Sequence, residues 1–225
     1  MATTKRAVKA RPAGDLTKER ILAAAERLFA DAGFEGVSMR QVGAAADVPF
    51  ALVTYHFQTK LGLYREVFRR RSRFTASARI EQLEAIKISG QPLEDVRAVA
   101  AALVEPLMRV RHEEGGLHFS RLMSREVNDP QEAERGIVAE CFDPMARAAI
   151  SILKQAVPSA SDQQIYWAYH FATGAIAVNH ANTGRIERLS EGLCQSTNVS
   201  ELIRELTKFI SAGMAGALCP ELLHD

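Results

Sequence analysis

The chain contains residue types that could catalyse reactions or bind metals, but their spacing does not form a reactive site. The six histidines include no HExxH pattern and no Ser–His–Asp signature. Cys141, Cys194 and Cys219 are odd in number and far apart, which predicts neither a disulfide framework nor a CxxC metal site. The glycines of residues 33–43 follow no strand, so they form no phosphate loop. We expect no catalytic residue, no metal and no cofactor, with a helical enzyme as the alternative.

Residues 38–60 instead show a pattern that is typical of DNA binding. Two short helical patterns occur there, separated by a turn of about three residues, which is the spacing of a helix-turn-helix that places its second helix in the major groove. Ser38 and Gln41 form a capping box at the start of the first helix. Asp47 stands in the turn, where a left-handed residue is often needed, and Pro49 suits the start of the second helix.

The elements that would position this motif are helices. Apolar residues recur at helical spacing along the chain, and no segment shows the alternating pattern of a strand. The sequence therefore predicts an all-α fold of about nine helices. Their expected spans are residues 17–33, 38–46, 49–56, 60–88, 92–113, 117–128, 130–156, 161–183 and 199–218, with a loose connector at 184–198.

Composition and charge limit the cellular setting. Hydrophobic residues make up 47% of the 225 residues and charged residues 24%, which favours a soluble, mostly helical protein of one or two domains. The basic N-terminus has no apolar core of a signal peptide, and no segment approaches the roughly 20 apolar residues that span a bilayer. We expect a cytoplasmic protein that does not enter a membrane.

Charge is divided unevenly along the chain. Residues 1–73 carry 14 Lys and Arg against 7 Asp and Glu, whereas residues 74–225 carry 14 against 20. A basic first part and an acidic remainder fit a DNA-binding domain joined to a separate sensing or assembly domain, although such asymmetry also occurs without nucleic acid. Residues 1–16 form an expected disordered basic arm, which either reaches DNA or is a solvated tail.

Two segments of this sequence resemble the TetR family of bacterial transcriptional regulators. They are AERLFADAGFEGVSMRQVGAAADV and VTYHFQTKLGLY, and the resemblance covers about residues 17–70. It implies a three-helix helix-turn-helix DNA-binding domain at residues 17–62 and a helical effector-binding and dimerisation domain at residues 63–225. The implied function is that of a ligand-responsive homodimeric repressor, which binds a pseudopalindromic operator in double-stranded DNA and is released by a small apolar effector.

Other functions stay open beside this one. Within DNA binding, the chain could be an activator or a ligand-blind DNA-binding protein. In another class, it could be a helical interaction module or an enzyme whose helix-turn-helix no longer recognises a sequence.

The resemblance also implies roles for individual residues of the motif. Ser38, Tyr55, His56 and Lys60 look like phosphate or backbone contacts, Arg40 like a base or phosphate contact, and Ala51 and Thr54 lie on the groove-facing side. Ser38 would also be explained by its cap alone, and His56 by local packing.

Three positions depart from the family pattern: Pro49, Phe50 and Thr54. A capping serine or similar residue, a polar or basic residue, and an aromatic residue are common there in the family. Phe50 either touches thymine methyl groups or packs against a neighbouring part of the protein. Specificity should then depend on Arg40, Thr54, Phe50 and DNA shape more than on many hydrogen bonds.

The segments FSRLMSREV, IYWAYHFATGAI and FISAGMAGAL are weakly similar to a TetR subgroup that includes regulators of fatty-acid breakdown. This similarity implies an effector with an acyl chain or an aromatic ring. If it has a carboxylate, Arg121 or Arg125 could pair with it, and the alternative is that both are simply exposed or structural arginines. Residues that could line its cavity, or could simply be core, are Phe119, Leu122, Met123, Phe142, Met145, Trp167, His170 and Phe171.

The family dimerises through its last two long helices, which correspond here to residues 161–183 and 199–218. Small residues would allow two such helices to approach closely, and larger apolar ones would be buried between the subunits. The expected interface residues are Ala168, Ala172, Ala175, Phe209, Ile210 and Met214, for which ordinary intramolecular packing is the alternative.

Overall fold

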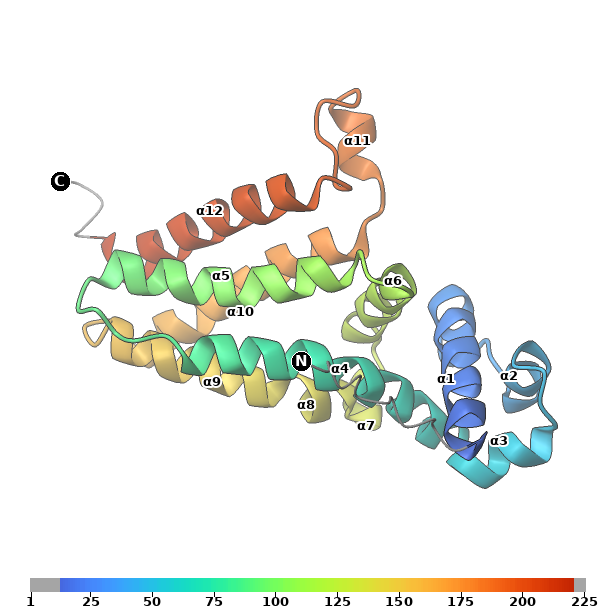
Figure 1. The fold of residues 1–225 in the computed structure, drawn as a ribbon. Helices are drawn as coiled ribbons and strands as arrows, with labels where there is room; N and C mark the ends of the chain where they lie inside the picture. Colours follow the sequence, from blue (N-terminus) through green and yellow to red (C-terminus); the bar gives the residue numbers. More distant parts are fainter. Residues whose placement is uncertain (1–12, 221–225) are drawn as a thin grey trace, which may run out of the picture. The chain divides into compact units, whose positions relative to one another are not determined.

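The computed structural model describes residues 13–220, apart from the side chains of Ala13 and residues 73–75 (Figure 1). This part of the chain contains helices and no strand, which confirms the predicted all-α fold. The helices are α1 (Ala13–Ala32), α2 (Met39–Ala45), α3 (Phe50–Phe57), α4 (Lys60–Glu84), α5 (Pro92–Val110), α6 (Gly116–Val127), α7 (Glu132–Arg135), α8 (Ile137–Cys141), α9 (Asp143–Ala156), α10 (Asp162–Ala181), α11 (Arg185–Leu189) and α12 (Val199–Leu218).

The chain divides into two compact units between Val67 and Phe68, inside α4. The sequence placed this boundary five residues earlier, after residue 62. α1 begins at Ala13, so residues 13–16 are helical rather than disordered as expected, and Asp15 in the first turn complements the helix dipole. The rest of the expected basic arm lies outside the described residues.

The first unit is built around apolar side chains of α1 to α4. Phe29 of α1 and Tyr64 of α4 are buried and meet edge to face with ring centroids 4.8 Å apart. Val53 and Phe57 of α3 are buried in the same unit. This core holds α1 and α4 behind the helix-turn-helix.

The second unit is a bundle in which α5 packs against α12 and α9, and α10 packs against α12, α9 and α6 (Figure 1). α5 contributes a nearly continuous buried face, in which Val96, Val99, Leu103 and Leu107 follow helical spacing. Burial of this face contributes to the stability of the bundle.

The described part has three more helices than the expected nine, and all three are short. Residues 130–156 form α7, α8 and α9 instead of one helix, because Gly136 adopts a left-handed φ of 65° and Pro144 starts a new helix. The third, α11, lies within the expected connector. No described helix is long and apolar enough to cross a membrane.

Candidate DNA interface and effector cavity

The turn of the helix-turn-helix is held by its own backbone and by α1. Asp47 has a φ of 52°, the left-handed conformation that the sequence suggested for it. Arg20 of α1 donates from Nη2 to the carbonyl oxygens of Ala46 (2.6 Å) and Asp47 (3.0 Å). A Cβ at Gly43 would lie only 3.1 Å from the carbonyl oxygen of Val48, so α2 and the turn approach closely here. The roles of Arg20 and Gly43 were not predicted from the sequence.

The other side of α3 faces away from the core. Tyr55 is 78% exposed and Phe50 38%, whereas Val53 is fully buried. Pro49 and Ala51 are exposed, and Thr54 and His56 are half-buried. Residues 50 and 51 each lie three to five positions before residues 54 and 55, so the four share one helix surface. This surface is the candidate for insertion into a major groove.

Phe50 is in contact with another candidate DNA residue. The guanidinium carbon of Arg40 lies 4.7 Å from the centroid of the Phe50 ring, in a cation–π arrangement that joins α2 to α3. The Thr54 hydroxyl lies within hydrogen-bonding distance of the carbonyl oxygens of Phe50 (3.2 Å) and Ala51 (3.0 Å). Its proton is therefore directed at its own helix, while its oxygen can still accept a bond.

Ser38 and Lys60 also have partners within the protein. The hydroxyl of Ser38 accepts a bond from the Gln41 amide (3.3 Å), and the Gln41 side chain accepts one from the Ser38 amide (2.8 Å). This is the predicted capping box. Lys60 Nζ lies 3.6 Å from Glu35 Oε2 and 4.4 Å from the Phe34 ring centroid. Lys60 is therefore positioned by Glu35 and Phe34 at the start of α4.

A family model described as bacterial regulatory proteins of the tetR family matches residues 21–67, which include the whole helix-turn-helix. A second model, described as the tetracyclin repressor-like C-terminal domain, matches residues 101–213 and so covers half of the chain. The chain belongs to the TetR family. It is a DNA-binding transcriptional regulator, as the resemblance of residues 17–70 implied.

Solved structures share the fold of this TetR-family chain. A TetR-like transcriptional regulator from Rhodococcus sp. RHA1 is 18% identical, with a TM-score of 0.58 over 91% of this chain and 100% of that one. A protein assigned to the family from Mesorhizobium loti MAFF303099 is 20% identical, with a TM-score of 0.53 over 92% and 98%. FadR from Bacillus subtilis, solved with stearoyl-CoA, is 11% identical, with a TM-score of 0.59 over 87% and 98%. No curated protein sequence matches the chain significantly.

The second unit of this TetR-family chain contains a cavity of about 230 Å³ bordered by α4, α5, α6, α8, α9 and α10. Three of the expected effector contacts, Met123, Phe142 and Met145, line it. Phe119 and Leu122 are fully buried but are not among its lining residues. Most of its other lining residues are apolar: Leu107, Val127, Val138, Ala146, Ile176 and Ala177.

Trp167, His170 and Phe171 do not line this cavity, although the sequence suggested them for an effector site. They are exposed on α10, Trp167 at 52% and Phe171 at 65%. The cavity is lined from α10 by residues of another face, including Tyr169 and Thr173. Because α10 carries apolar residues on several faces, their spacing alone did not show which face turns inward.

Arg121 and Arg125 follow the alternative given for them, and a different arginine lines the cavity. Arg121 and Arg125 are exposed and do not line it, whereas Arg79 of α4 is 4% exposed and does. Asp143 lies at the cavity too, with Oδ2 3.2 Å from Nη2 of Arg147. Within the described part, no group of three or more His, Cys, Asp or Glu could hold a metal ion.

All six expected dimer residues line a groove between α10 and α12. Ala168, Ala172, Ile210 and Met214 are buried between the two helices. At the surface, Phe209 is 70% exposed and Phe171 65%, and the Phe171 ring is stacked on Trp167 with centroids 5.4 Å apart. Several large apolar side chains are thus exposed together on one face, which is typical of a protein interface.

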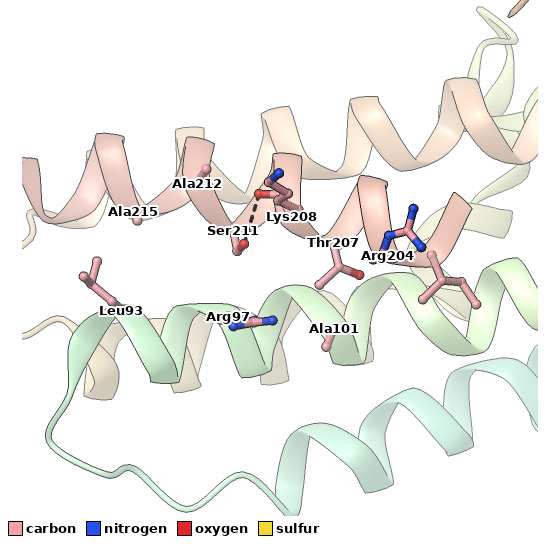
Figure 2. A pocket seen from close by; sticks show the side chains of 10 residues that line it. Leu93, Arg97, Ala101, Arg204, Thr207, Lys208, Ser211, Ala212 and Ala215 are labelled. Atoms are coloured by element: carbon pink, nitrogen blue, oxygen red, sulfur yellow. Dashed lines mark hydrogen bonds between the residues drawn. The ribbon is translucent and has the colours of Figure 1, made fainter. Parts of the chain in front are cut away.

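A separate groove of about 600 Å³ lies between α5 and α12 (Figure 2). Figure 2 shows Arg97 of α5 on one side and Lys208 and Ser211 of α12 on the other. Arg97 and Lys208 are exposed and Ser211 is half-buried, and Arg204 at one end is paired with Glu205 at 2.8 Å. The groove is larger than the cavity, but its cations are solvated, so burial imposes no need for an anionic partner there.

Proposed function

We propose that this chain is a homodimeric repressor that occupies a pseudopalindromic operator in the cytoplasm and is released by a small apolar effector. The observation that carries the proposal is that α4 belongs to both compact units. This continuous helix contains Lys60 beside the helix-turn-helix and Arg79 at the cavity of the second unit. A change in the cavity that shifts α4 would therefore be transmitted to the DNA-binding unit.

DNA binding is assigned to the surface that contains Arg40, Phe50, Ala51, Thr54 and Tyr55. Ser38, Pro49, His56 and Lys60 flank this surface, and the cationic and polar ones would contact the phosphate backbone. A single recognition helix buries too little surface for a tight specific site, so two copies of the chain are needed. The groove between α10 and α12, with its exposed Phe171 and Phe209, supports dimerisation there.

Release requires two states of the dimer. Recognition helices must lie about 34 Å apart to enter half-sites one helical turn apart, so a modest pendulum motion of α4 would remove the match. An effector can cause this only if it binds one state more tightly, and coupling energies of about 1–3 kcal/mol are typical. The complex of FadR with stearoyl-CoA supports an effector with an acyl chain for a protein of this fold.

A gel-shift titration against the DNA immediately upstream of the protein's own gene tests the proposal. We expect a retarded band that resists nonspecific competitor DNA and weakens steeply as the salt concentration rises. Absence of that band would contradict the proposed operator. If the band is present and no small apolar molecule, whether acidic or neutral, shifts it, a ligand-blind DNA-binding protein becomes the better assignment.

A further inference from the structure

Arg79 is a buried cation without an anionic partner. Its side chain is 4% exposed, it forms no ion pair within the described part of the chain, and its Nε atom has no hydrogen-bond acceptor there. The other buried arginines of this unit are compensated. Arg135 is paired with Glu126 and Asp129, and Arg111 donates to the carbonyl oxygens of Asn179 and Ser196. Burial of an unpaired charge costs free energy, so the burial of Arg79 is not explained by the stability of the fold.

The charged groups around Arg79 do not neutralise it. Asp143 also lines the cavity, but its carboxylate is paired with the exposed Arg147. Burial, together with the nearby Arg79 and Arg111, lowers the pKa of His180 to about 3, so this histidine is neutral. Burial raises the pKa of Tyr169, which lines the cavity with a protonated phenol. Among the described residues that line the cavity, Arg79 is thus the one cation, and the one carboxylate, Asp143, is paired with a different arginine.

The remaining lining determines what kind of anion fits. Apart from Arg79, Asp143, Tyr169 and Thr173, all the residues that line the cavity are apolar. Its volume of about 230 Å³ is below the ~300–1,000 Å³ of most ligand sites. A small molecule with an apolar body and a single anionic group fits this combination, and a guanidinium binds a carboxylate with two parallel hydrogen bonds.

We propose that the effector of this cavity is a small apolar carboxylate whose oxygens are bound by the Arg79 guanidinium. That the ligand regulates DNA binding rests on the proposed function, whereas ligand binding at Arg79 does not depend on DNA. Arg79 thereby compensates the ligand charge, and the ligand supplies the anion that the free protein lacks. Since Arg79 is in α4, the carboxylate of the ligand would contact the helix whose movement we propose to release the operator.

The test compares acids with their neutral analogues on the full chain. Octanoate, decanoate and phenylacetate are titrated by calorimetry beside octanol, decanol and 2-phenylethanol. We expect at least one acid to bind about 10- to 100-fold more tightly than its alcohol, the range that a hydrogen bond to a charged group supplies. Arg79→Met should abolish that preference, and Arg97→Met, in the groove between α5 and α12, should leave it unchanged.

A second variant keeps the experiment decisive if Arg79→Met does not fold. Arg79→Lys retains the charge but loses the planar pair of donors, so it should bind the acid more weakly than the natural protein and still prefer it to the alcohol. Equal binding of acids and alcohols, undiminished acid preference in Arg79→Met, or no binding of any of the three acids would overturn the inference.

The same ligands in the gel shift separate this inference from the proposed function. Arg79-dependent binding that leaves operator affinity unchanged would support the site and contradict release by the ligand. Failure to bind operator DNA at all would contradict the DNA assignment and leave the calorimetric result intact.

Discussion

At the scale of single residues, the candidate DNA surface combines flanking residues that match the family pattern, such as Ser38 and Lys60, with a residue that departs from it, Phe50. Ser38 caps α2, and Lys60 is positioned by Glu35 and Phe34. The contact between Arg40 and Phe50 explains how an aromatic residue is accommodated in a position where the family usually has a polar one. Phe50 restrains the arginine, so part of its effect on specificity would act through Arg40.

Lys60→Ala should weaken operator binding about equally for all DNA sequences. A phosphate contact contributes close to one released counterion, so the slope of log affinity against log salt should become smaller by about one. Fluorescence anisotropy titrations at several salt concentrations measure this slope. Lys208→Ala, which removes an exposed lysine of α12, is the control. An unchanged slope in Lys60→Ala would show that Lys60 serves only its contacts with Glu35 and Phe34.

Phe50→Ala and Thr54→Ala should each change the preferred operator sequence, and in different ways. The first removes the ring that holds Arg40, and the second removes a hydroxyl oxygen from the groove-facing surface. Selection of binding sites from a random DNA library gives the consensus for each variant. Leu16→Ala, at an exposed apolar position of α1, should keep the natural consensus. One shared, unaltered consensus for both variants would contradict this surface as the recognition site.

At the scale of helices, polar contacts fix the connections that spacing alone does not define. Arg20 of α1 holds the turn between α2 and α3, and Arg135 of α7 joins the end of α6. Arg135 forms two bonds of 3.0 Å to Glu126 and a 2.8 Å ion pair with Asp129. The side chains of Arg135 and Glu126 are only 6% and 1% exposed. The break of the expected helix 130–156 is thus accompanied by a buried ion pair.

Glu126→Gln should destabilise the second unit by about 3–5 kcal/mol, because Arg135 would lose its buried carboxylate partner. Urea unfolding followed by the fluorescence of Trp167, the single tryptophan, measures the change in this unit. Glu105→Gln breaks a surface pair with Arg109 and should have little effect. A double variant, Glu126→Leu with Arg135→Met, should recover much of the loss. Equal stability of Glu126→Gln and the natural protein would disprove the structural importance of this pair.

At the scale of the whole molecule, α4 connects the DNA-binding unit to the unit with the cavity, and a second copy would complete the regulator. The groove between α10 and α12 exposes Phe171 and Phe209 without a covering element in the described chain. Apolar surface of this kind favours association, because its burial removes it from water.

Phe209→Glu should convert the proposed dimer into a monomer, since a carboxylate would be buried without a partner in its interface. Light scattering after size exclusion measures the mass, and a gel shift should show a matching loss of operator affinity. Leu193→Glu changes a residue that is 88% exposed on the connector between α11 and α12 and should leave the mass unchanged. A Phe209→Glu dimer with natural operator affinity would disprove the assignment of the interface.

The sequence by itself determined the elements whose signals are local. Capping residues, helical spacing and the turn at Asp47 predicted the all-α fold, the helix-turn-helix and nearly all the long helices, because these features depend on neighbours in the chain. The short helices α7, α8 and α11 were missed, since each depends on a single break such as Gly136. The first residues of α1 were also missed, because no clear cap precedes them.

Only the tertiary structure decided which faces turn inward and which charges are buried. Trp167 and Phe171 are as apolar as the residues that line the cavity, yet they are on the surface of α10. Arg79 is within a basic and polar part of α4, where its sequence neighbours gave no sign of its burial among residues of α5, α9 and α10. Burial depends on contacts between residues distant in sequence, and these contacts arise only when the helices pack.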